Sequence, residues 1–234
     1  MQRIACVANV GRQSYSSGLK IQEFVSNMIK SWSQLNDTKG IIILVEHDPV
    51  YTVGIRNRDY DIEYEKRLRS LGAEFFRTGR GGLITFHGPG QLVSYPILNL
   101  KCFEPSVRWY VTQLEQVIIS TCADFGIKAS TSPHTGVWVN DKKICAMGLR
   151  VSQYITSHGL ALNCETDLNW FNHIVPCGIP NKGVTSLTVE CGKRISIGDA
   201  TSHFLKNFEQ LFDCRVKYCT EDILHEILSK SKSL

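Results

Sequence analysis

Several features that define common protein classes are missing from this 234-residue chain. It has no uninterrupted apolar run of about 18 residues, so we expect no membrane span. Neither G-x-G-x-x-G nor G-x-x-x-x-G-K-[ST] occurs, which argues against Rossmann and P-loop nucleotide sites. The net charge of +4 is too small to argue for nucleic-acid binding without a concentrated basic patch, so no nucleic-acid partner is expected.

The nine cysteines form neither a disulfide framework nor a zinc pattern. Their number is odd, no C-x-x-C pair occurs, and most of them stand singly in apolar segments. Cys214 and Cys219 flank the strand-like run RVKY but have no histidine at metal spacing. We therefore expect free thiols in a reducing compartment and no metal site.

The composition that remains is that of an ordinary globular protein, with 43% apolar and 21% charged residues. This length predicts a single domain over residues 1–234, with a helical tail at about residues 217–234. Strand-like and helix-like segments do not alternate one for one, and several neighbouring strands read as hairpins. The pattern predicts an α+β fold, in which helices pack on a mixed β-sheet.

Hydrophobic periodicity places most of the elements. Strands are expected in RIACVANV, IIILV, AEFFRT, QLVSYPILNL, GVWV, KICAMGLRV, YITSHGLALNC and RVKY. Helices are expected in LKIQEFVSNMIKSW, in DYDIEYEKRLRSLG, after Pro105 and Ser106, around Phe204 to Phe212, and from Glu221. The segment EHDPVYTVG, with Pro49, is expected to be a loop. The first 22 residues have the composition of a weak mitochondrial presequence, but a first strand and helix of the fold is the better interpretation.

The most informative stretch is RTGRGGLITFHGPGQLVSY, at residues 77–95. It holds five glycines within twelve residues, between apolar flanks that favour strands. Glycine is costly inside a strand, so backbone here must bend sharply or admit something close to it. A flexible hairpin would not explain why Arg80, Thr85 and His87 stand among the glycines. We therefore favour a ligand-facing loop.

Cys177 is the cysteine most suggestive of chemistry, because it lies between Pro176 and Gly178 in a rigid loop with little side-chain bulk. Such a loop can present the sulfur to a substrate, although a small residue filling a tight turn is the alternative. A nucleophilic cysteine needs a cation to favour the thiolate, which lowers the thiol pKa from about 8.5 to roughly 3.5–7.5. His158 and His173 are candidates for that cation.

Lys142 and Lys143 are further candidates, and they point to opposite faces if their segment is a strand. Alternation would put Lys143 on the same face as Cys145 and Met147, opposite Ala146. From this segment alone, two solvated lysines after a hairpin turn are the simpler interpretation.

The segment SHGLALN, at residues 157–163, places a glycine between a histidine and an apolar run. That glycine could let a ligand lie against the strand, and backbone N–H groups there could stabilise an oxyanion. A β-bulge is an equally plausible interpretation of the same residues.

Taken together, these segments closely resemble the lipoyl(octanoyl) transferases, in particular the animal mitochondrial branch of that family. The matching pieces are RGGLITFHGPGQ, KICAMGLR, SHGLALN and PCG…GVTSL, which occur in the family's order and at its spacing over nearly the whole chain to about Val216. The resemblance implies the fold of the biotin/lipoate protein ligases. It also implies transfer of an octanoyl group from acyl carrier protein to a lysine of lipoyl domains, in lipoate biosynthesis.

The resemblance assigns roles to individual residues. Cys177 would be the acyl-accepting nucleophile and Lys143 its partner in a Cys/Lys dyad. The acyl pocket would be lined by three groups of residues: Arg80, Gly81, Gly82, Leu83, Ile84, Thr85, Phe86 and His87; Ala146, Met147 and Gly148; and Gly159, Leu160 and Ala161.

The resemblance further implies partners and a location. No cofactor is expected, because the acyl donor is carried on the phosphopantetheine of acyl carrier protein. The acceptors would be lipoyl domains of 2-oxoacid dehydrogenases and the glycine cleavage H protein, in the mitochondrial matrix. Two alternatives stay open: an ATP-dependent lipoate or biotin ligase, which needs no cysteine nucleophile, and a non-catalytic protein that binds lipoyl domains.

Overall fold

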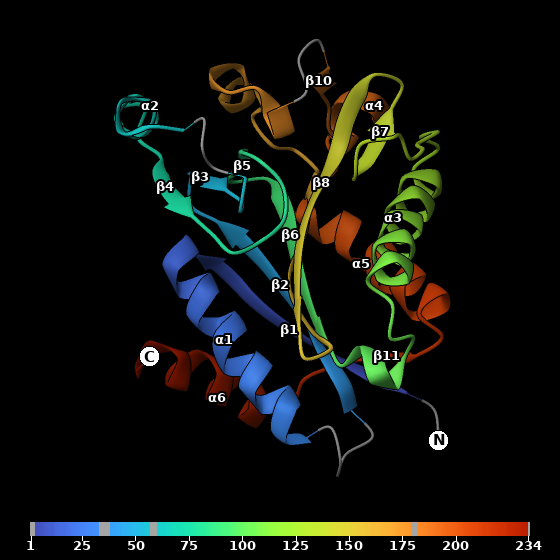
Figure 1. The fold of residues 1–234 in the computed structure, drawn as a ribbon. Helices are drawn as coiled ribbons and strands as arrows, with labels where there is room; N and C mark the ends of the chain where they lie inside the picture. The colour runs from blue at the N-terminus through green and yellow to red at the C-terminus, as the bar shows by residue number, and fades with distance from the viewer. Residues whose placement is uncertain (1–2, 33–37, 57–59, 179–181, 234) are drawn as a thin grey trace.

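The computed structural model describes residues 3–32, 38–56, 60–178 and 182–233, without the side chains of Cys177 and Ser233 (Figure 1). Its centre is an eight-stranded mixed sheet, which confirms the predicted α+β class. The strand order is β10-β8-β9-β6-β2-β1-β11, and β7 pairs with β8. The strands are β1 (Ile4–Gln13), β2 (Thr38–His47), β6 (Gln91–Leu98), β7 (Val137–Val139), β8 (Lys142–Ser152), β9 (Ile155–Asn163), β10 (Gly183–Val184) and β11 (Arg215–Tyr218).

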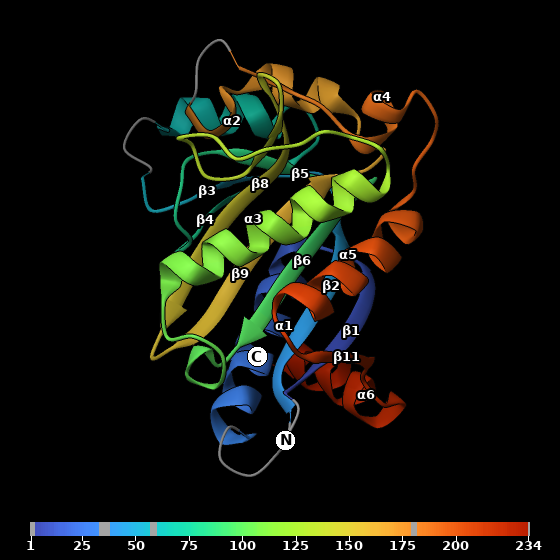
Figure 2. The ribbon, with the colours of Figure 1, turned by 90° about the vertical axis from the view of Figure 1, so that its right-hand side faces the viewer.

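Helices cover both faces of this sheet (Figures 1 and 2). One face carries α1 (Tyr15–Trp32) and α6 (Glu221–Lys230), and the other carries α3 (Val107–Asp124) and α5 (Ile197–Leu211). The side chains of the continuous apolar run of β2 alternate between the two faces of the sheet, so they contribute to both hydrophobic cores. Ile41 and Ile43 belong to the core under α1, whereas Ile42 and Leu44 belong to the core under α3 and α5.

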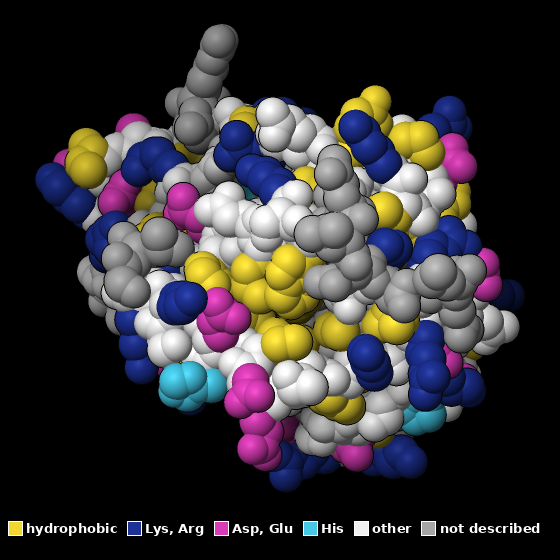
Figure 3. All heavy atoms as spheres, turned by 90° about the horizontal axis from the view of Figure 1, so that it is seen from below, with side chains coloured by type: hydrophobic (Ala, Val, Ile, Leu, Met, Phe, Trp, Pro, Cys, Tyr) yellow, Lys and Arg dark blue, Asp and Glu magenta, His cyan; other side chains and the backbone are white. Residues whose placement is uncertain are grey.

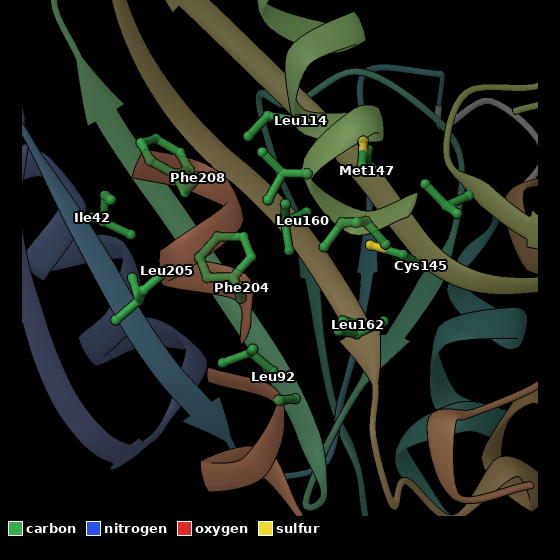
Figure 4. Packing of buried hydrophobic residues seen from close by; sticks show 14 of the residues in the cluster. Ile42, Leu92, Leu114, Cys145, Met147, Leu160, Leu162, Phe204, Leu205 and Phe208 are labelled. Atoms are coloured by element: carbon green, nitrogen blue, oxygen red, sulfur yellow. The ribbon is translucent and has the colours of Figure 1, made fainter. Parts of the chain in front are cut away.

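The core under α3 and α5 is the larger of these two, and Figure 4 shows its centre. Phe204, Leu205 and Phe208 of α5 are buried against the apolar face of β2, β6 and β9. Helix α3 begins after Ser106, whose Oγ accepts a hydrogen bond from the backbone N–H of Trp109 at 3.2 Å. This confirms the helix start expected at Pro105–Ser106.

A second sheet of three strands lies beside the first, in the order β4-β3-β5. Its strands are β3 (Val50–Val53), β4 (Glu74–Arg77) and β5 (Thr85–His87), with helix α2 (Ile62–Arg69) between the first two in the chain. The prediction that EHDPVYTVG is a loop is therefore wrong, because this segment contains β3. Pro49 stands just before the strand, which pairs with β4 and β5 on its two sides. Tyr51 and Val53 are fully buried in the hydrophobic core of this small sheet.

The remaining elements are short. They are the 3-10 turns Leu100–Cys102, Leu168–His173, Pro176–Gly178 and Ser231–Ser233, and helix α4 (Leu187–Cys191). The C-terminal helix α6 packs on α1 and buries Ile227 completely. In the described part of the chain, no helix is long and apolar enough to cross a membrane. Seen from below (Figure 3), basic and acidic side chains are interspersed around a group of hydrophobic ones.

Candidate active site

A narrow cavity of about 30 Å³, here called the central cavity, lies between the glycine-rich segment and strands β8 and β9. It is lined by Tyr15, Arg80, Gly82, Leu83, Thr85, His87, Val93, Tyr95, Ala146, Met147, Gly148, His158, Gly159, Leu160 and Ala161. The lining comes from five separate stretches of chain. Strand pairing and the packing of α1 bring those stretches together.

Two glycines make this close approach of backbones possible. Gly148 and Gly159 face each other across β8 and β9. A Cβ on Gly148 would stand 2.8 Å from Cδ of Arg80, and one on Gly159 would overlap the carbonyl oxygen of Ser94 in β6. The β8–β9 pairing runs through both positions without a register shift, so the β-bulge interpretation of SHGLALN is wrong. The glycines let neighbouring chain segments come close.

Most residues expected in the acyl pocket line the central cavity: Arg80, Gly82, Leu83, Thr85, His87, Ala146, Met147, Gly148, Gly159, Leu160 and Ala161. Gly81 lies just outside it and donates its N–H to the Leu149 carbonyl at 2.9 Å. Ile84 and Phe86 do not line it. They are fully buried in the core of the small sheet, where Phe86 stacks on Trp170 at 5.0 Å. The segment becomes a strand at Thr85, and its side chains then alternate between cavity and core.

The sequence interpretation missed the lining residues Tyr15, Val93 and Tyr95, and it named His158 only as a candidate cation for the Cys177 thiolate. Val93 and Tyr95 are two positions apart on β6, so strand periodicity could have found them together. Tyr15 opens α1 and is buried, with burial raising the pKa of its hydroxyl to about 12. Tyr15 reaches the cavity because α1 packs beside it, and no local sequence pattern predicts that packing.

A chain of hydrogen bonds begins beside the central cavity at Arg80. The Arg80 guanidinium donates to Oγ1 of Thr52 at 2.8 Å, and that hydroxyl pairs with Nε2 of His87 at 3.3 Å. Nδ1 of His87 pairs with Oε1 of Gln91 at 2.8 Å. Because the Gln91 oxygen can only accept, we assign the His87 proton to Nδ1 and the Thr52 proton to the bond with Nε2.

The same chain continues towards the loop that carries Cys177. The Gln91 amide donates to Oδ1 of Asn163 at 2.9 Å, and the Asn163 amide donates to the carbonyl of Thr185 at 2.9 Å. Thr185 in turn donates its backbone N–H to the Lys143 carbonyl at 3.0 Å. The Gln91 and Asn163 amides have fixed orientations, because each is bonded through both its oxygen and its nitrogen. The chain thus holds the cavity wall and β8 in register.

The histidines at the central cavity are held neutral. Burial lowers the pKa of His87 to about 3 and that of His158 to about 4. His47 lies behind them, with Nε2 2.8 Å from the Tyr95 hydroxyl, and burial lowers its pKa to about 4. Burial also raises the pKa of Tyr95 well above its ordinary value. At neutral pH the lining contributed by these rings is therefore uncharged.

The direction of Lys143 corrects the face assignment made from alternation. Trp138 pairs with Lys143, but Val137 pairs with Cys145, so β8 has one extra residue at Ile144. A bulge of this kind puts two successive side chains on one side of the strand, and Ile144 and Cys145 both enter the apolar core. Lys143 therefore lies on the same side as Ala146, and both line one small cavity.

Lys143 is almost fully buried, with 5% of its surface exposed. Its Nζ donates to the carbonyl of Thr135 at 3.2 Å and lies 4.7 Å from the centre of the Trp138 ring. Lys142, the neighbouring candidate, is exposed. The pattern of this segment alone did not distinguish the two lysines, but the structure does. Lys142 is solvated, and Lys143 is held inside the protein.

Cys177 lies in the 3-10 turn Pro176–Gly178, and its side chain is outside the part of the chain that the structure describes. The structure does describe the backbone of this turn. Gly178 donates its N–H to the carbonyl of Val175 at 2.9 Å, and Pro176 lines the same small cavity as Lys143, about 10 Å³ in volume. The backbone next to Cys177 thus adjoins the site of the buried lysine. Candidate His173 is half-buried at the end of the preceding 3-10 turn.

A wider groove of about 410 Å³ leads to the same place from outside. It shares Gly82, Met147 and Gly148 with the central cavity and also contains Lys143. Its outer wall is formed by Val107 and other residues of α3 and of the 133–135 segment. Among the described side chains, no group of three or more His, Cys, Asp or Glu is arranged to hold a metal ion.

Comparison with known proteins agrees with this architecture. A crystal structure of lipoate-protein ligase A bound with ATP superposes with a TM-score of 0.73 at 15% identity, covering 100% of this chain and 97% of that one. That likeness defines the fold, the one shared by lipoate protein ligases. The family model named lipoyl protein ligase A/B catalytic domain matches residues 15–209. The chain therefore belongs to the lipoyl protein ligase A/B catalytic-domain family.

Closer relatives carry a more specific name. An octanoyl-[acyl-carrier-protein]:protein N-octanoyltransferase, mitochondrial, from Danio rerio is 56% identical over 211 residues, covering 90% of this chain and 93% of that protein. The human protein of the same name is 47% identical over 179 residues, covering 75% and 77%.

Proposed function

We propose that this protein transfers an octanoyl group from octanoyl-acyl carrier protein to a lysine of a lipoyl domain, through an octanoyl thioester on Cys177. The observation that carries the proposal is the position of Lys143. It is buried and lines both the wider groove and the small cavity that Pro176 also lines, next to a central cavity whose histidine and tyrosine rings are uncharged. The names of the relatives supply the acyl group and its donor.

In the first half-reaction, the thiolate of Cys177, paired with the Lys143 ammonium, attacks the thioester carbonyl of the donor. Backbone N–H groups near the nucleophile stabilise the tetrahedral oxyanion. The carbon–sulfur bond to the phosphopantetheine arm then breaks, and the leaving thiolate takes a proton from Lys143. The products are octanoyl-Cys177, the free carrier thiol and a neutral Lys143.

In the second half-reaction, a neutral lysine amine of the acceptor attacks the octanoyl-Cys177 carbonyl. Lys143 accepts the proton that the new amide nitrogen loses, and Cys177 leaves as a thiolate. This step restores the starting ion pair. Because a thioester is converted to an amide, the reaction is downhill and needs neither ATP nor another cofactor.

The central cavity suits an alkyl chain. Burying some six or seven methylenes at about 0.8 kcal/mol each provides roughly 5 kcal/mol of binding. One methylene more or less changes this only modestly, so we expect preference for eight carbons without absolute selectivity. At about 30 Å³ the cavity is narrow, and the lining side chains must move apart to admit the chain.

The acceptors we propose are lipoyl domains of 2-oxoacid dehydrogenases and the glycine cleavage H protein. The relatives are named as mitochondrial proteins, and we place this protein in the mitochondrion, in the matrix. An ATP-dependent lipoate ligase remains the rival activity. It would activate a free acid as an acyl-adenylate and would have no need of Cys177.

Intact-mass analysis separates these activities. Incubation with octanoyl-acyl carrier protein in the absence of nucleotide should add one octanoyl mass, located on the peptide that contains Cys177. Cys177→Ala should abolish this addition, and Cys102→Ala, in a half-buried cysteine outside the site, should not. Octanoylation that requires ATP and free octanoate would instead establish the ligase.

A lysine pair provides a matched control for the proposed partner of Cys177. Lys143→Ala should slow octanoyl transfer strongly, whereas Lys142→Ala, at the exposed neighbouring position, should leave it within about twofold of wild type. Equal rates for the two variants across pH 6 to 9 would remove Lys143 from the mechanism.

A further inference from the structure

Residues 134–138, which read HTGVW, surround the side chain of Lys143 and have no role in the mechanism above. Trp138 and Lys143 are both almost fully buried, at 3% and 5% exposure. The ring lies 4.7 Å from Nζ, and the Thr135 carbonyl accepts from Nζ at 3.2 Å. A buried ammonium has given up water, and an aromatic face and a carbonyl are groups that replace it favourably.

The segment is fixed before any substrate arrives. The backbone of Trp138 makes two hydrogen bonds with Ser130, at 2.8 and 2.9 Å. Its indole Nε1 donates to the carbonyl of His134 at 3.1 Å, which sets the plane of the ring. Gly136 donates its N–H to Oε1 of Glu115 on α3 at 3.0 Å. The ring and the Thr135 carbonyl are therefore held from several sides.

Gly136 leaves room for the lysine. Its φ is +118°, a conformation that side-chain-bearing residues rarely adopt. A Cβ there would stand 2.6 Å from the carbonyl oxygen of Cys145 and 3.4 Å from Cε of Lys143. The stem of Lys143 thus runs along the backbone of Gly136 to reach the Thr135 carbonyl. The fixed ring of Trp138, the fixed carbonyl of Thr135 and the backbone of Gly136 together form a binding site for one ammonium group.

We propose that Trp138 is a positioning residue for the octanoyl transfer: its ring holds the Lys143 ammonium in the orientation that pairs it with Cys177. The inference rests on the proposed function, in which Lys143 favours the Cys177 thiolate and exchanges protons with the leaving thiol and the incoming amine. The strand pairing Trp138–Lys143 puts ring and amine opposite each other, and the bulge at Ile144 fixes this register. Trp138 acts through Lys143 in this proposal.

The test compares a variant that keeps an aromatic face with one that removes it. Trp138→Leu should slow single-turnover acylation of Cys177 by about 30-fold, which corresponds to the roughly 2 kcal/mol of a desolvated cation–π contact. Trp138→Phe, which keeps a ring, should stay within about fivefold of wild type. The KM for octanoyl-acyl carrier protein should change little in either, because the groove and the central cavity are untouched.

Alkylation of Cys177 by iodoacetamide, located by peptide mass, gives a second readout without any acyl donor. It needs the thiolate, so Trp138→Leu should slow it and Trp138→Phe should not. Trp109→Leu, on α3 against Phe212, is the matched control and should leave both rates unchanged. Urea unfolding of each variant shows that it is folded, and Trp138→Met replaces the leucine variant if that one is not.

Two results would overturn the positioning role: a leucine variant that acylates and alkylates at the wild-type rate, or leucine and phenylalanine variants that are equally impaired. Failure of the proposed function has a different signature. A wild-type protein that takes up no octanoyl group would refute the transferase mechanism, and the alkylation rates of Cys177 would still decide whether Trp138 orients Lys143.

Discussion

His158 gives a measurable link between pH and stability. Its side chain is 8% exposed, and burial, followed by the charges of Arg80 and Arg150, lowers its pKa to about 4. In an unfolded chain the pKa of histidine is about 6.5. Between these values the unfolded state binds more protons than the folded state. Stability from neutral His158 is therefore complete above pH 6.5 and is lost as the pH falls towards 4.

The size of this effect follows from the shift in pKa. At about 1.36 kcal/mol per unit, His158 accounts for roughly 2 kcal/mol of lost stability at pH 5 and about 3 kcal/mol below pH 4. His47 and His87, whose pKa values are also lowered by burial, add losses of the same sign. Since folded domains have about 5–15 kcal/mol of stability, three such losses should remove a large part of the stability of the wild-type protein by pH 5.

The substitution His158→Asn isolates one share of this loss. His158 has a φ of +57°, and asparagine tolerates that left-handed conformation better than most residues. The variant removes the titrating ring, so its free energy of unfolding should fall by about 2 kcal/mol less than that of wild type between pH 7.5 and pH 5.0. Urea unfolding followed by circular dichroism at the two pH values measures this difference.

His225→Gln is the control, because His225 lies exposed on α6. It should lose as much stability as wild type over the same pH range. If His158→Asn also lost as much as wild type, the buried neutral state of His158 would not be a source of the acid sensitivity, and the reasoning would be refuted.

Substitutions at three further positions test how the fold is held together. Gly159→Ala would force a Cβ into the carbonyl of Ser94, so it should lower the free energy of unfolding by on the order of 3 kcal/mol in urea titrations. Gly198→Ala, inside α5 with its nearest neighbouring atom at 3.7 Å, should instead raise it by about 0.5–1 kcal/mol, and a loss there would show that helix propensity does not govern this position. Ser196→Ala removes the capping box at the start of α5, in which Ser196 and Asp199 bond reciprocally. It should cost about 1 kcal/mol, while Ser196→Gly should cost only a few tenths; equal losses would argue against the side-chain cap.

Periodicity in the sequence was sufficient for the strands that are regular and deeply buried. IIILV alternates between two cores and could be recognised as a strand without knowing which face was which. It was insufficient for β8, because the pairing of that strand with β7 has a bulge that no residue type in KKICAMG reveals. One inserted residue moved Lys143 to the face of Ala146 and decided which lysine adjoins the Cys177 turn.

The glycine-rich motif likewise shows that the sequence does not reveal which side chains face the cavity. The resemblance treated residues 80–87 as one lining block, yet Ile84 and Phe86 turn into the core of the small sheet once the chain becomes β5. Conversely, Tyr15 lies outside every motif and Tyr95 lies beyond the matching piece that ends at Gln91, yet both line the cavity, because α1 and β6 pack beside it. Sequence motifs identify the segments of a site, whereas packing selects which side chains within and beyond them face it.

The polar rings of His47, His87 and Tyr95 around the central cavity are compatible with an alkyl chain because their polar atoms are already bonded, whereas Nδ1 of His158 is buried without a hydrogen-bond partner. Both ring nitrogens of His47 have partners, the Gln13 carbonyl at 3.1 Å and the Tyr95 hydroxyl at 2.8 Å. His87 is likewise bonded through both nitrogens, to Gln91 and Thr52. A hydrocarbon that lies against such rings meets carbon surface and leaves no donor or acceptor newly unsatisfied. The neutral, bonded rings of His47, His87 and Tyr95 therefore behave as an apolar part of the wall beside the Arg80 guanidinium, and they do so only while the histidines stay unprotonated.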